Sequence, residues 1–408
     1  MKKKLACLLL AACMCLSLAA CGNSGSQASS EPAASAAADE TPAAGGEITI
    51  GTISPNTGSL AAYGTAVTTA VDLAVEEINA AGGINGNQVK VVNADDQMDP
   101  TECLNAFNSL VSQGIGLIIG SVASSCTSAI TDAANEESVV LLTPASTADS
   151  ITTEDDYVFR ACYADSFQGA IAAAYAKQSG YTDVGVVYCA SDTYSKGLYD
   201  SFSSACKKYG VNVKAVESTA SLDVQDYTNQ FASMVKAGVN FVYAPYYYDV
   251  VGPYVVTQAR AAGYKGIIMG ADGYDGTPDY VVEGADLSVF NDVYWTNHYD
   301  PADTDVKVQS FVTAYQAKFN STPNAISALA YDAVYMYKQA IEKAGSADAA
   351  AVRDAMADTS AVYSGVTGTF SLDESGTPAK GASIISFTSD GTSVTTKLVD
   401  VVKELPAA

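Results

Sequence analysis

The chain has little histidine and little positive charge. His298 is its only histidine, and 45 aspartate and glutamate residues outnumber 21 lysine and arginine residues, for a formal net charge of −24 over 408 residues. One imidazole excludes metal sites built on several histidines, and a Ser-His-Asp triad would have to use His298 without any GxSxG turn to hold its serine. We therefore expect no enzyme, no metal and no cofactor. The acidic charge also argues against nucleic acid as a partner.

Long apolar segments are absent beyond the N-terminus. Three lysines precede an uncharged apolar run over residues 5–20, which is shorter than the roughly 20 residues that span a bilayer. This pattern predicts an export signal over residues 1–20, and LAAC, which ends at Cys21, resembles the lipobox of bacterial lipoproteins. The resemblance implies cleavage before Cys21 and lipidation of its thiol, with an ordinary cleaved signal as the alternative. Residues 21–46, rich in Ser, Ala, Gly and Pro, are then a flexible tether.

The cysteines outside this leader are odd in number. Nine cysteines are present, of which three lie in the expected signal and Cys21 is the expected anchor. The remaining five match no zinc-site spacing, and an odd set leaves at least one thiol free or paired with another chain. A disulfide between Cys103 and Cys126 is one arrangement that an export route permits. The five are Cys103, Cys126, Cys162, Cys189 and Cys206.

The roughly 360 residues from Glu47 onward alternate between strand-like and helix-like segments, and their number suggests two lobes. Repeated βαβ units predict an α/β fold with mostly parallel sheets, in which ligands bind at the carboxyl ends of strands. Expected strands cover residues 47–53, 88–96, 115–119, 139–143, 183–189, 211–217, 240–244, 266–270, 368–372, 382–388 and 393–402. Expected helices cover residues 64–83, 99–114, 194–209, 227–236, 255–263, 303–319, 325–344 and 347–357.

Two helix starts carry local signals. Asp99 is an expected N-cap, with Pro100 at the first helical position and Glu102 closing a capping box. The stretch GSVASSCTSA at residues 120–129 follows an apolar strand, five of its ten residues carry a hydroxyl, and a helix is expected to open at Ser124 or Ser125. Free N–H groups and hydroxyls at such a strand end suit an anion.

Five blocks of sequence resemble one protein family. NAAGGINGNQVKVVNADDQMDP at residues 79–100 is similar to a diagnostic stretch of the solute-binding proteins of branched-chain amino acid ABC transporters. IIGSVASSCT, LLTPAST, FVYAPYYY and IMGADGYDG match further blocks in the same order, so the resemblance covers about residues 47–387. It implies a type I periplasmic-binding-protein fold, in which two Rossmann-like lobes joined by a three-strand hinge close on a ligand.

The resemblance also implies lobe boundaries and partners. Residues 47–163 and 297–381 are expected to form the N-terminal lobe, and residues 164–296 and 382–402 the C-terminal lobe. The expected protein is a monomeric, lipid-anchored, extracytoplasmic binding protein that delivers a branched-chain or related amino acid to the permease and ATPase subunits of an ABC importer. The chain has no P-loop of its own to supply the energy. A receptor of the same fold that senses amides, short peptides or aromatic compounds is the alternative.

Family positions assign one wall of the ligand site. By resemblance, Ser124 receives the α-carboxylate of an amino acid, and Ala123 lies beside the ligand side chain. Thr147 holds both carboxylate and ammonium, the Ala145 carbonyl accepts from the ammonium, and Ser146 lies nearby. Structural roles stay open, because Ser124 can be only a helix cap and Thr147 can simply close a turn.

The other wall contributes Asp272, which the resemblance makes the partner of the ammonium, although relatives have glutamate there. Tyr63, Tyr194 and Tyr247 fall where aromatic rings line or cover the ligand. Ile326 stands where some relatives place an aromatic wall, so the side-chain pocket is expected to differ. An Asx turn at Asp272 is the structural alternative, as is simple packing for any of the 25 tyrosines. Closure is expected to depend on the ligand, as the only link between the two walls.

Lipidation is tested by Cys21→Ala. Without this thiol the protein should appear in the medium or stay unprocessed, because acyl chains would supply its hold on the bilayer. Cell fractionation and the mass of the mature chain measure this, and Cys15→Ala within the expected signal serves as the matched control. A Cys21→Ala protein that stays membrane-bound at its mature mass would contradict the prediction.

Overall fold

The computed structural model describes residues 45–152, 157–281 and 284–407. Cys21, the expected signal and most of the expected tether lie outside the described residues, so lipidation stays a prediction. From β1 (Glu47–Ser54) to β10 (Val293–Asn297) strands and helices alternate, which confirms the expected α/β fold. Within these three ranges, no helix has the length and apolar character needed to cross a bilayer.

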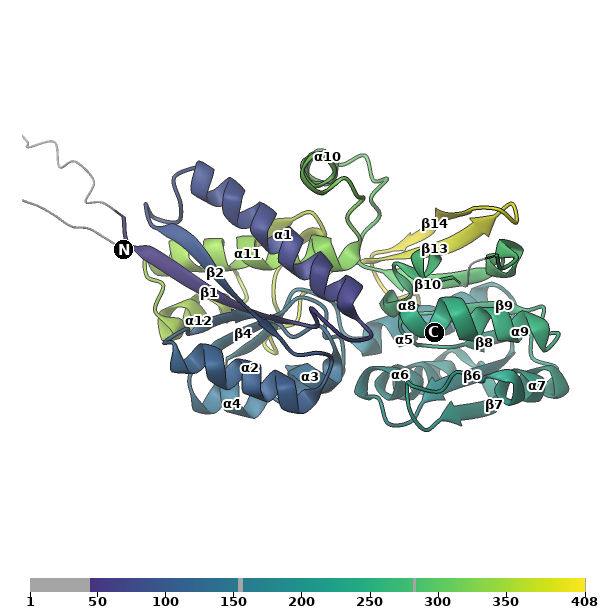
Figure 1. Cartoon of the computed structure of the whole chain (residues 1–408). Helices are drawn as coiled ribbons and strands as arrows, with labels where there is room; N and C mark the ends of the chain where they lie inside the picture. Colours follow the sequence, from purple (N-terminus) through teal and green to yellow (C-terminus); the bar gives the residue numbers. More distant parts are fainter. Residues whose placement is uncertain (1–44, 153–156, 282–283, 408) are drawn as a thin grey trace, which may run out of the picture. The chain divides into compact units, whose positions relative to one another are not determined.

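The first sheet has five parallel strands in the order β2-β1-β3-β4-β5. Strands β3 and β4 are buried along their whole length, as expected for a parallel sheet covered on both faces. Helices α1 and α11 lie together over one face, and α2, α3 and α4 cover the other (Figure 1). The elements are β2 (Gln88–Asp95), β3 (Leu117–Ile119), β4 (Val140–Thr143), β5 (Val158–Arg160), α1 (Ala61–Ala80), α2 (Pro100–Ser112), α3 (Ser124–Ser128), α4 (Thr131–Glu136), α11 (Ala325–Ala344) and α12 (Ala349–Met356).

The second sheet has seven strands in the order β14-β13-β10-β9-β8-β6-β7, and β13 alone runs antiparallel to the others, pairing with β10 on one side and with β14 on the other. The chain reaches it after β5, leaves it after β10 and returns to it at β13, so it passes three times between the sheets. The lobe boundaries expected from the resemblance stay a prediction. The elements are β6 (Asp183–Cys189), β7 (Asn212–Thr219), β8 (Phe241–Tyr243), β9 (Ile267–Gly270), β13 (Ala382–Ser389), β14 (Val394–Val402), α5 (Asp165–Gln178), α6 (Thr193–Tyr209), α7 (Thr228–Ala237), α8 (Tyr248–Val250) and α9 (Thr257–Ala261).

Shorter elements complete the fold. Helix α10 (Val306–Phe319) precedes α11, and β11 (Tyr363–Gly365) pairs with β12 (Gly368–Phe370) as a separate two-stranded ribbon. A 3₁₀ turn, η3 (Asp272–Tyr274), follows β9 and begins with the acidic residue singled out in the sequence. A π-helical stretch, η2 (Val251–Val256), joins α8 to α9.

The start of α2 is predicted correctly in all but one contact. Pro100 is the first helical residue, and the Asp99 carboxylate accepts hydrogen bonds from the N–H groups of Thr101 at 2.7 Å and Glu102 at 3.1 Å. The capping box is wrong, because the Asp99 N–H donates to the Asp96 carbonyl at 2.8 Å instead of meeting the Glu102 side chain.

The start of α3 contradicts the structural alternative in which Ser124 is only a helix cap. Ala123 is the N-cap and Ser124 is the first helical residue, so Ser124 is not the helix cap. Its hydroxyl accepts a hydrogen bond from the Ala148 N–H at 3.3 Å, which links the loop after β3 to the loop after β4. Because α3 has only five residues, its free N–H groups rather than a long helix dipole are what it offers to a ligand.

Sequence reasoning missed β5, α5, β10 and β11, and it placed the helix at 255–263 too late. Nine of the fourteen residues of α5 are buried, most of them alanine, so no polar face marks it as amphipathic. The helix through α8 and α9 begins at Tyr248, and its π-helical stretch contains Gly252 and Pro253, which the sequence signals as helix breakers.

All five described cysteines are buried free thiols. The disulfide considered for Cys103 and Cys126 is therefore not formed in this structure. The two thiols are neighbours, since a hydrogen bond with Cys126, together with burial, raises the pKa of the Cys103 thiol. A raised pKa keeps the reactive thiolate scarce, so this pair behaves as core packing.

Tyr337 fixes α11 to the first sheet through its hydroxyl. Its fully buried hydroxyl lies 2.9 Å from the Ile118 carbonyl and 2.8 Å from the Val140 carbonyl. Tyr337→Phe should lower the free energy of unfolding by about 1–2 kcal/mol, measured as a lower urea midpoint. Tyr188→Phe, at a half-buried tyrosine stacked on Tyr199, is the control and should change it by less than about 0.5 kcal/mol. Equal midpoints for the two variants would refute this role.

Candidate functional site

A small cavity lies at the strand ends that the sequence singled out. About 10 Å³ of it is open to the centre of a water molecule, which is about the room that one water needs. An amino acid is larger, so the walls have to separate before one can enter. Seven of the ten expected ligand-binding residues line it, together with Val122 and Gly273: Tyr63, Ser124, Ala145, Tyr194, Tyr247, Asp272 and Ile326.

Two of the other three expected residues support the wall instead of forming its surface. Ala123 is the cap of α3. Ser146 bonds inward: its N–H donates to the Thr143 hydroxyl at 2.9 Å, its hydroxyl lies 2.5 Å from that of Thr127, and it donates to the Val122 carbonyl at 3.0 Å. These bonds join the loop after β3 to the loop after β4, so part of the hydroxyl-rich stretch serves to fix the wall.

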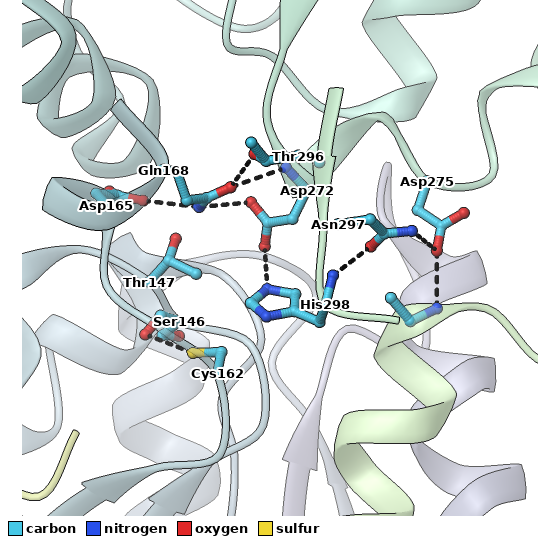
Figure 2. Close-up of polar contacts among 12 residues, drawn as sticks. Ser146, Thr147, Cys162, Asp165, Gln168, Asp272, Asp275, Thr296, Asn297 and His298 are labelled. Carbon is cyan, nitrogen blue, oxygen red and sulfur yellow. Dashed lines mark hydrogen bonds and ion pairs between the residues drawn. The ribbon is translucent and has the colours of Figure 1, made fainter. Parts of the chain in front are cut away.

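Thr147 is the third residue that the cavity lining does not include. Its carbonyl accepts hydrogen bonds from the Arg160 guanidinium at 2.9 Å and from the Asp165 N–H at 2.8 Å. Its hydroxyl points toward the Asp165 side chain (Figure 2). Burial raises the pKa of the Asp165 carboxyl well above its ordinary value, so the protonated, neutral form is favoured. The Thr147 hydroxyl itself is buried and has no hydrogen-bond partner in the structure.

The Asp272 carboxylate is held by three donors. Its Oδ1 accepts from the Tyr194 hydroxyl at 2.8 Å and from the Gln168 side chain at 2.9 Å, and its Oδ2 lies 3.1 Å from Nε2 of His298 (Figure 2). The Asx turn considered for Asp272 is wrong, because these donors occupy its side chain. A carboxylate can accept about four hydrogen bonds, so with three accepted it can still accept one from a group in the cavity.

Gln168 on α5 is the centre of this network. Its amide nitrogen donates to Asp165 at 3.2 Å as well as to Asp272, and its amide oxygen accepts from the Asp272 N–H at 3.2 Å and from the Thr296 hydroxyl at 2.7 Å. All four hydrogen-bonding positions of the amide are therefore used, which fixes its orientation. A side chain held in this way positions Asp272 from both its backbone and its carboxylate.

Glycine is required next to Asp272. A Cβ at Gly273 would lie 2.7 Å from the Tyr246 carbonyl oxygen and 2.8 Å from the Tyr194 hydroxyl. The Gly273 N–H donates to the same hydroxyl at 2.8 Å, while that hydroxyl donates to Asp272. Tyr194, which also stacks on Tyr247 with ring centroids 4.8 Å apart, is thus fixed by the turn that it supports.

Direct contacts join the two sides of the cavity. The Tyr63 hydroxyl on α1 donates to the carbonyls of Gly273 at 3.0 Å and Asp275 at 3.1 Å, and the Asp275 carboxylate accepts from the Ala325 N–H at 2.7 Å. Tyr248 adds a hydroxyl that accepts from the Ala62 N–H at 3.2 Å. The expectation that only a ligand would join the two walls is therefore wrong.

The arrangement offers a carboxylate on one side, a hydroxyl and helix-start N–H groups on the other, and aromatic and aliphatic side chains around them. Such a cavity can hold a small molecule that has a positive group, a negative group and an apolar part. Across the described ranges, no group of three or more His, Cys, Asp and Glu side chains is placed to hold a metal ion.

Sequence reasoning missed four residues of the site: Val122, Gln168, Gly273 and His298. Val122 and Gly273 adjoin expected residues in the chain, so their motifs pointed to them. Gln168 lies 104 residues from Asp272 on a helix without an amphipathic signal, and His298 was considered only as part of a triad. The one available signal for His298 was that it is the only histidine of the chain.

Two α/β halves connected by three crossings, with an aromatic-lined cavity at their strand ends, define a binding protein of the type I periplasmic class. The chain matches the periplasmic binding protein family over residues 47–392 and belongs to that family.

Relatives of known name support this assignment. The chain is 32% identical to Leu/Ile/Val-binding protein homolog 3 of Brucella melitensis over 336 residues, which cover 82% of this chain and 89% of that protein. A leucine-binding protein from Thermotoga maritima has 30% identity and a TM-score of 0.78, with coverage of 87% and 98%. A branched-chain amino acid transporter substrate-binding protein from Streptococcus pneumoniae, solved with isoleucine, has 31% identity and a TM-score of 0.77, with coverage of 86% and 99%.

Tyr63→Phe tests the contacts that join the two walls. Loss of a hydroxyl bonded to two carbonyls should disfavour the closed form by about 1–1.4 kcal/mol, a five- to tenfold shift toward the open form. If the free protein is mostly closed, its radius of gyration in X-ray scattering should rise; if it is mostly open, ligand affinity should fall five- to tenfold.

The matched control is Tyr243→Phe, whose buried hydroxyl has no hydrogen-bond partner in the structure. An unchanged radius of gyration together with an unchanged affinity in Tyr63→Phe would show that these bonds do not govern closure.

Proposed function

We propose that this protein captures an amino acid with an apolar side chain outside the cytoplasm and delivers it to an ABC importer. The single observation that carries the proposal is the buried Asp272 carboxylate at the cavity. A buried charge is costly unless it is paired, and the three donors around Asp272 leave the cavity as the place where a positive group can complete its partners.

The opposite wall suits a negative group. Ser124 lines the cavity as the first residue of α3, where backbone N–H groups have no partner within the helix. A ligand with an ammonium toward Asp272 and a carboxylate toward Ser124 is an α-amino acid. Aromatic carboxylates lack the ammonium and would place their charge in the field of Asp272, which argues against the sensing alternative for such compounds.

The rest of the lining suits an apolar side chain. Tyr63, Tyr247, Val122 and Ile326 surround the cavity, and all are nearly fully buried. Burial of a leucine-sized side chain contributes about 1.5–3 kcal/mol. The named relatives, which include leucine- and isoleucine-binding proteins, support a branched-chain or related ligand.

Transport and anchoring complete the proposal. A relative named as a transporter substrate-binding protein supports permease and ATPase subunits as the partners, and the monomeric state belongs to the same proposal. The lipobox-like sequence at Cys21 and the polar tether after it support a lipid anchor on the outer side of the cell membrane.

The ligand class is tested by thermal unfolding and calorimetry with all proteinogenic amino acids and with benzoate. A ligand at about 100 times its dissociation constant adds roughly 2.7 kcal/mol to the free energy of unfolding, enough for a clear shift. One or more apolar amino acids should shift the midpoint and benzoate should not. A panel in which no amino acid binds would overturn the proposed function.

Asp272→Asn should weaken amino acid binding roughly 10- to 100-fold, because a charge-assisted hydrogen bond is worth about 1.5–3 kcal/mol. The measurement is calorimetry with the amino acid that the panel identifies. Tyr246→Phe is the control: its buried ring packs on Tyr227, and its hydroxyl lies 3.1 Å from that of Thr219, away from the cavity lining. Unchanged affinity in Asp272→Asn would mean that the ammonium is held elsewhere.

A further inference from the structure

The proposed function does not explain the position of His298. It follows β10 directly, its side chain is fully buried, and its Nε2 lies 3.1 Å from Oδ2 of Asp272 (Figure 2). Its ring stacks on Tyr163, with ring centroids 3.7 Å apart and an angle of 27° between the planes. Stacking fixes the plane of the imidazole, so Nε2 stays aimed at the carboxylate.

The second ring nitrogen defines the tautomer. Nδ1 is buried and has no hydrogen-bond partner in the structure. An ionised carboxylate only accepts hydrogen bonds, so Nε2 has to carry the hydrogen that meets Asp272. A hydrogen on Nδ1 would be buried without an acceptor, which is costly. The geometry therefore favours a neutral ring with its hydrogen on Nε2.

The three partners of Asp272 come from elements of the seven-stranded sheet or from the segment that directly follows it. Gln168, Tyr194 and His298 belong to segments that adjoin the seven-stranded sheet, as does Asp272 itself at the end of β9. None of these three hydrogen bonds involves residues of the first sheet. Gln168 and Tyr194 therefore hold the carboxylate from its own side, and His298 holds it from the segment that leaves β10.

We propose that His298 is a positioning residue that presents Asp272 to the ligand ammonium while neutral and weakens amino acid binding when protonated. This rests on the proposed function, because it assigns the ammonium to Asp272. A neutral His298 leaves one net negative charge in the pair, which attracts a cation. A protonated His298 cancels that charge and competes with the ammonium for the same carboxylate.

The surroundings of His298 set the direction of its titration. Burial lowers the pKa of His298 below its ordinary 6.5, the Asp272 carboxylate opposes this, and the Lys380 ammonium adds to it. Tyr163 covers the ring as a neutral phenol, since burial raises its pKa well above the ordinary value. His298 is therefore neutral at pH 7 and takes up a proton only under more acidic conditions.

Ligand binding should lower the pKa of His298 further, because the ammonium is a second positive charge beside Asp272. Binding is then linked to loss of a proton. Affinity is full above the pKa of the free protein and falls as the pH drops through it, approaching tenfold per pH unit. Asp165 joins the same network through Gln168, so its titration has to be separated from that of His298.

The first test needs no ligand. Because His298 is the only histidine, untagged protein labelled in histidine gives one set of imidazole signals in NMR. Long-range nitrogen–proton correlation should report the Nε2–H tautomer at pH 7. The titration of His298 should move to lower pH in Asp272→Asn and stay unchanged in Asp300→Asn, which removes a carboxylate two residues away. An Nδ1–H tautomer, or equal titrations in wild type and Asp272→Asn, would overturn the proposal.

The second test is calorimetry from pH 5 to pH 8, with L-leucine as the first probe. Wild-type affinity should fall on the acidic side, whereas His298→Gln, which donates to Asp272 without titrating, should bind at pH 5 nearly as it does at pH 7.5. An identical acidic decline in both proteins would assign the effect to Asp165 and overturn the proposal. If no amino acid binds at pH 7.5, the proposed function fails, while the NMR result still decides the His298–Asp272 pair.

Discussion

The site depends on the burial of one carboxylate. Asp272 is 4% exposed beside a cavity that is mostly apolar, and a carboxylate without partners there would be far too costly to keep ionised. The surrounding fold meets this cost by bringing together donors from α5, from α6 and from the end of β10. Gln168 does so with its whole amide, which leaves no freedom for rearrangement.

Burial also gives the neighbouring carboxyl groups of Asp165 and Asp272 different roles. Asp165 is buried with Gln168 as a partner and is driven toward its neutral form, whereas Asp272 has three donors. Two ionised carboxylates at this distance from one amide would repel each other, and a neutral Asp165 avoids this. One charge is thereby retained at the cavity, where it has a use, and the second carboxyl group serves as a hydrogen-bonding part of the wall.

The sequence was sufficient for elements with a period or a cap. Helix α11 was expected at its observed bounds, and in the structure the Asn324 side chain caps its start and Gly345 follows its end in the left-handed conformation. Helix α5 was missed because burial around its circumference removes the amphipathic pattern on which sequence reasoning relies. Strands β5, β10 and β11, with three to five residues each, were missed, whereas β3 and β8, which are equally short, stood out as uninterrupted apolar runs.

In the candidate site, too, local motifs were predictable from the sequence and long-range packing was not. The residues taken from the family resemblance line the cavity where they are motif positions at strand ends, such as Ser124 and Asp272. Thr147 lies outside the cavity lining, beside Asp165 and Arg160, which no local motif connects to it, and its expected contact with the ligand stays a prediction. The donors around Asp272 come from distant parts of the chain, and only the packing of α5 and β10 beside β9 brings them together.

Closure of this protein cannot be ascribed to the ligand alone. Tyr63 and Asp275 already connect the two sides through hydrogen bonds, and the cavity between them has room for about one water. A closed form without ligand therefore competes with the closed form that contains one, and only the difference between their free energies appears as affinity. Contacts common to both forms favour closure without favouring the ligand. Discrimination among ligands must then come from groups that the closed form cannot satisfy by itself, and the remaining acceptor capacity of Asp272 is the clearest of these.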